Sequence, residues 1–281
     1  MTLSLTRLAW AFYCAATVAS FAVLFRRDGR WGRWGLNLLA AGAVLQTAAL
    51  LSALPATWVC AENRYQLPLH TLFGMMTLLS LAVAATFFIV ESRRRLGILG
   101  AFVLPWTVLF CGAAALAGVP AAAPGPAARV WWTDLHPVLL TAAYASLANA
   151  FGVGLAWLVQ ERQIKSRAPA EVCYRLPALE QLDDLHFRLV AVGAAHMAAG
   201  LILGGLWAKH AWKHPYGWDP KLLGACATAA GYAAFLYLRA FGGWRGRRGV
   251  FLAMGAFGVL AASFLGGDFL SRFHGFLLRG P

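Results

Sequence analysis

The sequence is poor in charged residues. They make up 12% of its 281 residues, whereas a soluble domain has about 25%. So few charges cannot cover a surface that faces water, which excludes an ordinary soluble globule. Hydrophobic residues make up 60% of the chain and the mean hydropathy is +0.63. The shortage of charge therefore predicts a protein that is largely surrounded by lipid.

The sequence also lacks paired cysteines and catalytic motifs. Its five cysteines lie far apart, and no Cys-x-x-Cys or Cys-x-x-Cys-His occurs, which argues against a thiol-redox motif and against covalent haem attachment. No Gly-rich phosphate loop, nucleophile elbow or zinc-protease motif is present. A basic leader with a cleavage site is missing, so the first apolar block is expected to remain as a membrane span. No acidic residue lies deep in an apolar block, which argues against a secondary transporter.

What the sequence does contain is a series of long apolar blocks. A bilayer core about 30 Å thick needs about 20 apolar residues of helix. The chain is therefore predicted to be an all-α, polytopic integral membrane protein with about eight transmembrane helices in one domain over residues 1–281. The predicted spans are Leu8–Phe25, Leu36–Leu54, Leu72–Val90, Leu96–Gly118, Pro137–Val159, Phe187–Ala208, Leu222–Leu238 and Val250–Leu265.

The basic residues divide unequally between the two predicted faces. The net charge is +13, and 16 of the 24 lysines and arginines lie at one face against eight at the other. Because these charges lie in short loops between apolar blocks, they indicate topology rather than a nucleic-acid groove. By the positive-inside rule the richer face is cytoplasmic, so both termini are expected outside the cytoplasm.

Histidines and aromatic residues gather at the predicted outer face. Five of the seven histidines fall there: His70, His136, His210, His214 and His274. The tryptophans alone could form an ordinary interfacial belt, and a single histidine could be a polar residue at a wet boundary. Together they favour a flat, apolar ligand that carries a metal, and haem fits because its iron takes imidazole ligands and its ring needs apolar walls.

One stretch of this face has a specific pattern. It reads Trp207-Ala-Lys-His-Ala-Trp212-Lys-His-Pro-Tyr216-Gly-Trp218-Asp219-Pro220-Lys221, and a histidine flanks it on each side, His136 in Asp-Leu-His-Pro and His274 in Arg-Phe-His-Gly. The stretch resembles the tryptophan-rich extracytoplasmic loop of the cytochrome c assembly family, the haem-handling membrane proteins of the CcsA, ResC and CcmC type. The resemblance extends from about residue 67 to the end of the chain.

The resemblance implies a function and a set of residues. It implies that His136 and His274 are axial ligands of a non-covalently bound haem b. The platform around the haem would consist of Trp207, Trp212, Tyr216, Trp218, Asp219 and Pro220. The implied partners are apocytochrome c, a ResB-like membrane protein and thiol-reducing assembly proteins, with the chain in a bacterial plasma membrane. Membership of a haem lyase complex is implied too, although the chain shows no acid–base or nucleophilic group of its own.

The sequence departs from the family pattern at several positions. Tyr237 stands where one branch has a haem-ligating histidine within the membrane, and His196 is a possible substitute or else a packed histidine. Small residues, Gly224 and Ala229, replace tryptophans. Asp134 could orient His136 through its second nitrogen or cap a helix. A regulatory or scaffold protein that has lost haem transfer is therefore the alternative function.

Overall fold

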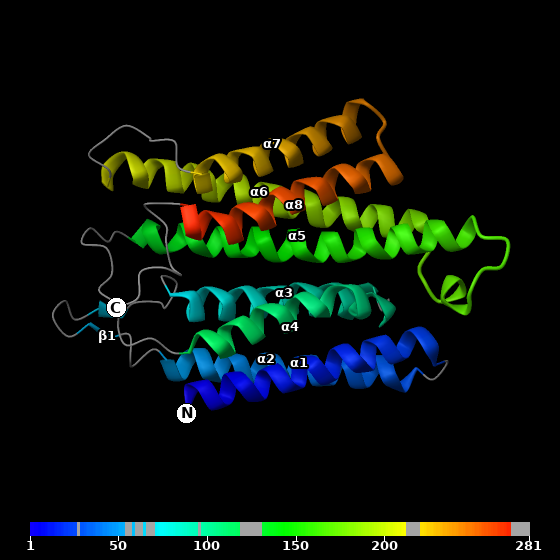
Figure 1. The fold of residues 1–281 in the computed structure, drawn as a ribbon, viewed down its shortest axis with the longest axis horizontal. Helices are drawn as coiled ribbons and strands as arrows, with labels where there is room; N and C mark the ends of the chain where they lie inside the picture. The colour runs from blue at the N-terminus through cyan, green and yellow to red at the C-terminus, as the bar shows by residue number, and fades with distance from the viewer. Residues whose placement is uncertain are drawn as a thin grey trace. The chain divides into compact units, whose positions relative to one another are not determined.

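The structure is a computed structural model that describes residues 1–26, 29–53, 58–59, 64–65, 71–94, 97–118, 131–211 and 220–270. Its elements follow one another as shown in Figure 1. They are α1 (Thr2–Phe25), α2 (Arg30–Ala53), β1 (Trp58–Val59), β2 (Arg64–Tyr65), α3 (Leu72–Arg94), η3 (Gly97–Leu99), α4 (Gly100–Ala117), α5 (Trp131–Ile164), η4 (Glu171–Tyr174), α6 (Leu179–Ala211), α7 (Pro220–Phe241) and α8 (Arg247–Leu270).

Eight helices in the described part of the chain are long and apolar enough to cross a membrane. They coincide with the eight predicted apolar blocks, which confirms the all-α polytopic membrane fold. An antiparallel pair of two-residue strands, β1 and β2, is the one addition within the described residues. Helices α5 and α6 contain 34 and 33 residues, so each is about 50 Å long and exceeds the bilayer core.

The chain divides into two compact units, and the division falls within α5 and α6. Unit 1 contains Met1–Ala122 and Ala148–Phe187, and unit 2 contains Ala123–Leu147 and Arg188–Pro281. Unit 1 therefore holds the first four long helices together with the C-terminal half of α5. Unit 2 holds the N-terminal half of α5, most of α6, and α7 with α8.

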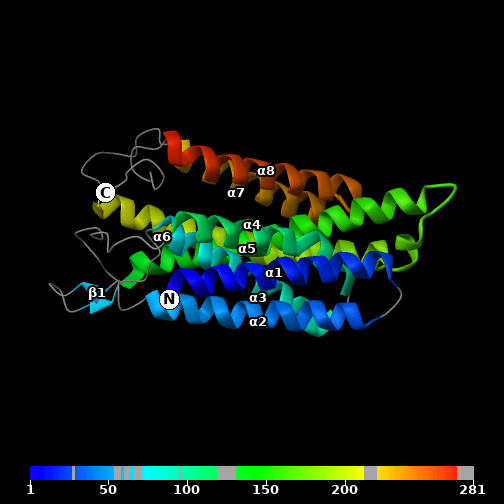
Figure 2. The ribbon, with the colours of Figure 1, turned by 60° about the horizontal axis from the view of Figure 1, so that its bottom comes forward.

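In unit 1, α1 packs against α2 and α4, and α3 packs against α4 and α2 (Figures 1 and 2). A buried polar network joins three of these helices. The hydroxyl of Tyr13 donates to Oε1 of Gln46 at 2.6 Å, and Nε2 of Gln46 donates to the carbonyl oxygen of Thr77 at 3.2 Å and to the hydroxyl of Ser80. Polar side chains buried in a membrane bundle must find such partners, because lipid offers none.

In unit 2, glycines allow α5 and α6 to approach closely. A Cβ added at Gly193 or at Gly200 would come within 2.7 Å of a leucine on α5. The facing leucines are Leu147 and Leu140 respectively. Small residues at contacts of this kind are typical of membrane helix pairs, since no hydrophobic effect drives association within lipid.

The other helices of unit 2 form a hairpin. Helices α7 and α8 pack against each other, and a Cβ at Gly224 would overlap the side chain of Ser263. A tryptophan does not fit at residue 224 in this arrangement, which gives a physical reason for that departure from the family pattern. The ring of Tyr144 on α5 meets Phe264 on α8 edge to face, with centroids 6.0 Å apart.

Candidate haem-ligand site at the start of α5

His136 lies near the beginning of α5, where that helix packs against the C-terminal part of α6. Its side chain is half-buried. Its Nδ1–H donates a hydrogen bond to the carbonyl oxygen of Gly200, at 2.7 Å. This bond fixes the position of the ring and the location of its proton.

The imidazole of His136 occupies a space that glycine leaves open. A Cβ at Gly204 would come within 2.6 Å of Cε1 and 2.7 Å of Nδ1 of His136, closer than carbon atoms approach without displacement. Gly205, the next residue, has nothing within 4 Å of the same added atom. The ring therefore depends on the glycine at 204 and not on the one at 205.

The hydrogen bond determines what the second ring nitrogen can do. In a neutral imidazole only one nitrogen carries a proton. Because Nδ1 is the donor to Gly200, Nε2 carries the lone pair. Metal-binding histidines commonly donate their other N–H to a backbone carbonyl in this way, which orients the ring and makes the ligand more basic. The donor chemistry of His136 therefore fits a haem iron.

The end of α8 reaches the level of His136 within unit 2. Tyr144 on α5 and Phe264 on α8 are in contact, and the two helices run in opposite directions (Figure 1). His136 lies eight residues before Tyr144, about 12 Å along the helix, and the end of α8 at Leu270 lies six residues beyond Phe264, about 9 Å. The predicted second ligand, His274, lies outside the described residues.

The predicted aromatic platform is described only at its borders. The backbone of Trp207 belongs to α6, three residues beyond Gly204, and Pro220 is the exposed first residue of α7. Proline suits a first helical position because the N–H that it lacks has no partner there. The remaining predicted platform residues lie outside the described part of the chain: Trp212, Tyr216, Trp218 and Asp219.

The other described histidines lie in different surroundings. His186 is buried in unit 1, and its Nδ1–H donates to the carbonyl oxygen of Ala150 at 2.9 Å. His196 is half-buried and donates to Val192 of its own helix at 2.8 Å. Among the described residues, no three His, Cys, Asp or Glu side chains come together as a metal cluster.

Three further predictions concern single residues. Tyr237, at the position of the intramembrane histidine, is 64% exposed and packs on Phe241 with ring centroids 5.1 Å apart. Tyr237 therefore lies on the surface of the described helices. Asp134 lies inside the first turn of α5 and is not its capping residue. His210 belongs to the backbone of α6, while His70 and His214 lie outside the described residues.

Sequence reasoning missed the glycines that hold His136, although a signal was present. Along α6 the glycines at 193, 200 and 204 are spaced by seven and four residues. Along α5 the facing residues Leu147, Leu140 and His136 show the same spacing in reverse. Two matching heptad-like patterns on consecutive spans indicate a close antiparallel contact, with the histidine as its last member.

Comparison with known proteins gives a consistent family. The model of the cytochrome C assembly protein family matches residues 69–274. A cytochrome c biogenesis protein CcsA from Synechococcus sp. (strain CC9902) is 30% identical and covers 72% of this chain and 75% of its own. The CcsA of Thermosynechococcus vestitus is 27% identical, over 90% and 93% of the two chains.

A solved structure shares the fold. The cytochrome c heme lyase CcmF superposes with a TM-score of 0.72 at 19% identity. The alignment covers 97% of this chain and 47% of CcmF, so the chain spans about half the length of that protein. At this identity the likeness concerns the arrangement of the helices alone.

Proposed function

We propose that this chain, a member of the cytochrome c assembly protein family that serves cytochrome c maturation, binds haem non-covalently and presents it for attachment to apocytochrome c. His136 carries the proposal. Its Nδ1–H bond to Gly200, at 2.7 Å, leaves the lone pair on Nε2 for iron. Because the imidazole of His136 already lies in the gap left by Gly204, it is oriented before haem binds, which reduces the entropy lost on binding.

His274 is the proposed second axial ligand. The contact between Tyr144 and Phe264 sets the register of α5 and α8, and in that register the chain that follows α8 starts close to the level of His136. The imidazoles of His136 and His274 would together hold the haem iron, which takes histidine ligands. When bound, haem supplies this iron together with the vinyl groups that become thioethers on the client protein.

The aromatic platform is proposed to surround the haem. Its members are Trp207, Trp212, Tyr216, Trp218, Asp219 and Pro220. The ends of α6 and α7 that border this stretch lie at the same end of unit 2 as His136, since Gly204 is three residues before Trp207. Aromatic side chains provide the large apolar surfaces that a porphyrin ring requires.

The proposed location rests on the distribution of the basic residues, and the proposed partners rest on the family to which the chain belongs. With the basic loops inside the cytoplasm, His136 faces the outside of a bacterial plasma membrane, where cytochromes c receive their haem. An apocytochrome c is the proposed client. A ResB-like membrane protein and thiol-reducing assembly proteins are proposed to complete the complex, the latter because the cysteines of the client must be reduced before thioethers form.

The experiment is a visible spectrum of the purified chain together with a pair of glycine variants. The parent is expected to show a Soret band of low-spin, bis-imidazole haem. Gly204→Ala should weaken the haem affinity of the folded protein about tenfold, because displacing the ring is expected to cost about 1.4 kcal/mol of binding free energy, and it should lose most of the band where haem is not in excess. Gly205→Ala is the matched control, since both variants place alanine in the same helix and gain the same helix propensity.

Two outcomes contradict the proposal. A colourless parent protein that still supports cytochrome c maturation in cells would favour the scaffold or regulatory function. Equal haem content in Gly204→Ala and Gly205→Ala, with both proteins folded, would show that the imidazole of His136 does not take part in haem binding.

A further inference from the structure

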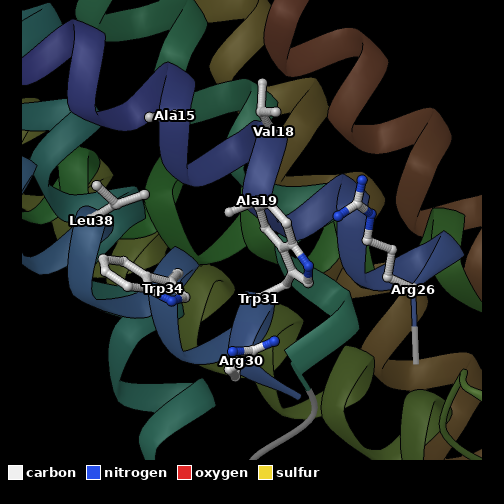
Figure 3. A pocket seen from close by; sticks show the side chains of 8 residues that line it. All are labelled: Ala15, Val18, Ala19, Arg26, Arg30, Trp31, Trp34 and Leu38. Atoms are coloured by element: carbon white, nitrogen blue, oxygen red, sulfur yellow. The ribbon is translucent and has the colours of Figure 1, made fainter. Parts of the chain in front are cut away.

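A cavity lies in unit 1, between the C-terminal end of α1 and the N-terminal end of α2. It encloses about 580 Å³ between α1 and α2. Figure 3 shows that both helices contribute to its walls. The lining residues are Ala15, Val18 and Ala19 from α1, Arg26 directly after that helix, and Arg30, Trp31, Trp34 and Leu38 from α2.

The mouth of this cavity is cationic. Arg26 and Arg30 line it, and an adjoining pocket adds Arg33 beside Arg30 and Trp34. The guanidinium of Arg26 lies 4.9 Å from the centre of the Trp31 ring, a stacking geometry that orients the arginine. Arginine side chains suit an anion because each carries a full positive charge and several N–H donors.

The body of the cavity is apolar and opens sideways. Val18 is 67% exposed and Trp34 is 60% exposed, so within the membrane this wall faces lipid. The groove extends from Ala15 in α1 to Arg26, the residue directly after that helix, a span of about 17 Å at the helical rise. That length is close to the about 15 Å of one leaflet of the hydrocarbon core.

We propose that this cavity binds an anionic phospholipid of the cytoplasmic leaflet. Its phosphate would lie against Arg26, Arg30 and Arg33, and one acyl chain would lie along Ala15, Val18 and Leu38. Basic pockets between membrane helices bind anionic head groups in this manner. Topology alone requires positive charge near the helix ends, but it does not require a leaflet-long apolar groove beneath that charge.

Two other anions fit less well. Inorganic phosphate matches the arginines but leaves the apolar groove unfilled. Haem is an amphipathic dianion, but its iron takes His, Cys, Met or Tyr ligands, and none of these residue types lines the cavity. The shape of the cavity and the residues that line it therefore favour a lipid over the other two anions.

The test is native mass spectrometry of the full chain in detergent, titrated with phosphatidylglycerol or with phosphatidylcholine. The parent should retain phosphatidylglycerol in preference. Arg26→Gln/Arg30→Gln should lower its affinity by about 25-fold, since each interfacial arginine contributes about fivefold. The matched control is Arg245→Gln/Arg248→Gln, which removes the same charge from the loop after α7 and the first turn of α8 and should leave affinity within about twofold of the parent.

A second pair of variants tests the groove itself. Ala15 is exposed and lines the cavity, so Ala15→Phe would fill it without disturbing the helix contact. Ala11 is exposed one turn away on α1 and does not line it, so Ala11→Phe is the control. Loss of bound phosphatidylglycerol in Ala15→Phe alone would support the proposal.

Any of three results would overturn it. These are equal loss of phosphatidylglycerol in both charge variants, equal retention of the two lipids by the parent, and displacement of the lipid by inorganic phosphate or by haemin.

Discussion

Units 1 and 2 each place an imidazole against a carbonyl oxygen of another helix. In unit 1, His186 donates to Ala150 at 2.9 Å and is 1% exposed. In unit 2, His136 donates to Gly200 at 2.7 Å and remains half-buried. The two hydrogen bonds are chemically alike. The difference is that His136 lies near the first turn of its helix in a glycine-lined gap, so the same kind of bond that holds a core histidine in one unit orients the proposed haem ligand in the other.

The polar network of unit 1 supports this contrast. Tyr13 and Gln46 are both buried and bond to each other at 2.6 Å. These side chains satisfy one another inside the bundle and leave no donor for a ligand. Buried polar residues in a membrane protein are thus structural where they bond to each other, and candidates for function where the geometry leaves one atom accessible.

The largest expected effect separates the two histidines by stability. His186→Ala should destabilise the fold by about 2–4 kcal/mol, because it leaves a cavity and an unsatisfied buried group. His136→Ala should cost about 1 kcal/mol or less, since its site is half-open. The measurement is the apparent melting temperature of both variants in one detergent. If His136→Ala melted lower than His186→Ala, the contrast between a structural and a ligand histidine would fail.

A smaller effect is expected at the polar network. Tyr13→Phe leaves Oε1 of Gln46 without its donor and should cost about 1–2 kcal/mol. Tyr13→Phe/Gln46→Leu should cost less than the sum of the two single variants, with a coupling of about 1 kcal/mol in a double-mutant cycle. Strict additivity in chemical or thermal unfolding would show that the two side chains do not act as a pair.

Much of the fold could be predicted from composition alone. Eight apolar blocks gave the eight long helices because span length is set by bilayer thickness. The ends of α5 and α6 could not be predicted in the same way, since residues such as Asp134 and Arg162 end the apolar pattern while the backbone hydrogen bonds continue. The start of α6 shows the same limit: the apolar span was predicted from Phe187, but the helix begins at Leu179, and Asp184 within it pairs with Arg94 at 3.4 Å.

The candidate site was predictable in its residue type and less so in its geometry. The sequence pattern singled out His136 because its Asp-Leu-His-Pro segment is one of two histidine segments that flank the tryptophan-rich stretch along the chain. Its orientation did not, because that depends on Gly200 and Gly204, which lie more than sixty residues away along the chain. Gly224 is similar: only its contact with Ser263 explains why an aromatic residue is missing there.

The most direct test of iron ligation by His136 is chemical rescue of the low-spin Soret band. His136→Gly should lose that band, and added imidazole should restore it by occupying the vacated space as the ligand. Thr141→Ala, five residues further along α5, is the control and should keep the parental spectrum throughout. If His136→Gly retained the parental low-spin Soret band without imidazole, His136 would not be a haem ligand.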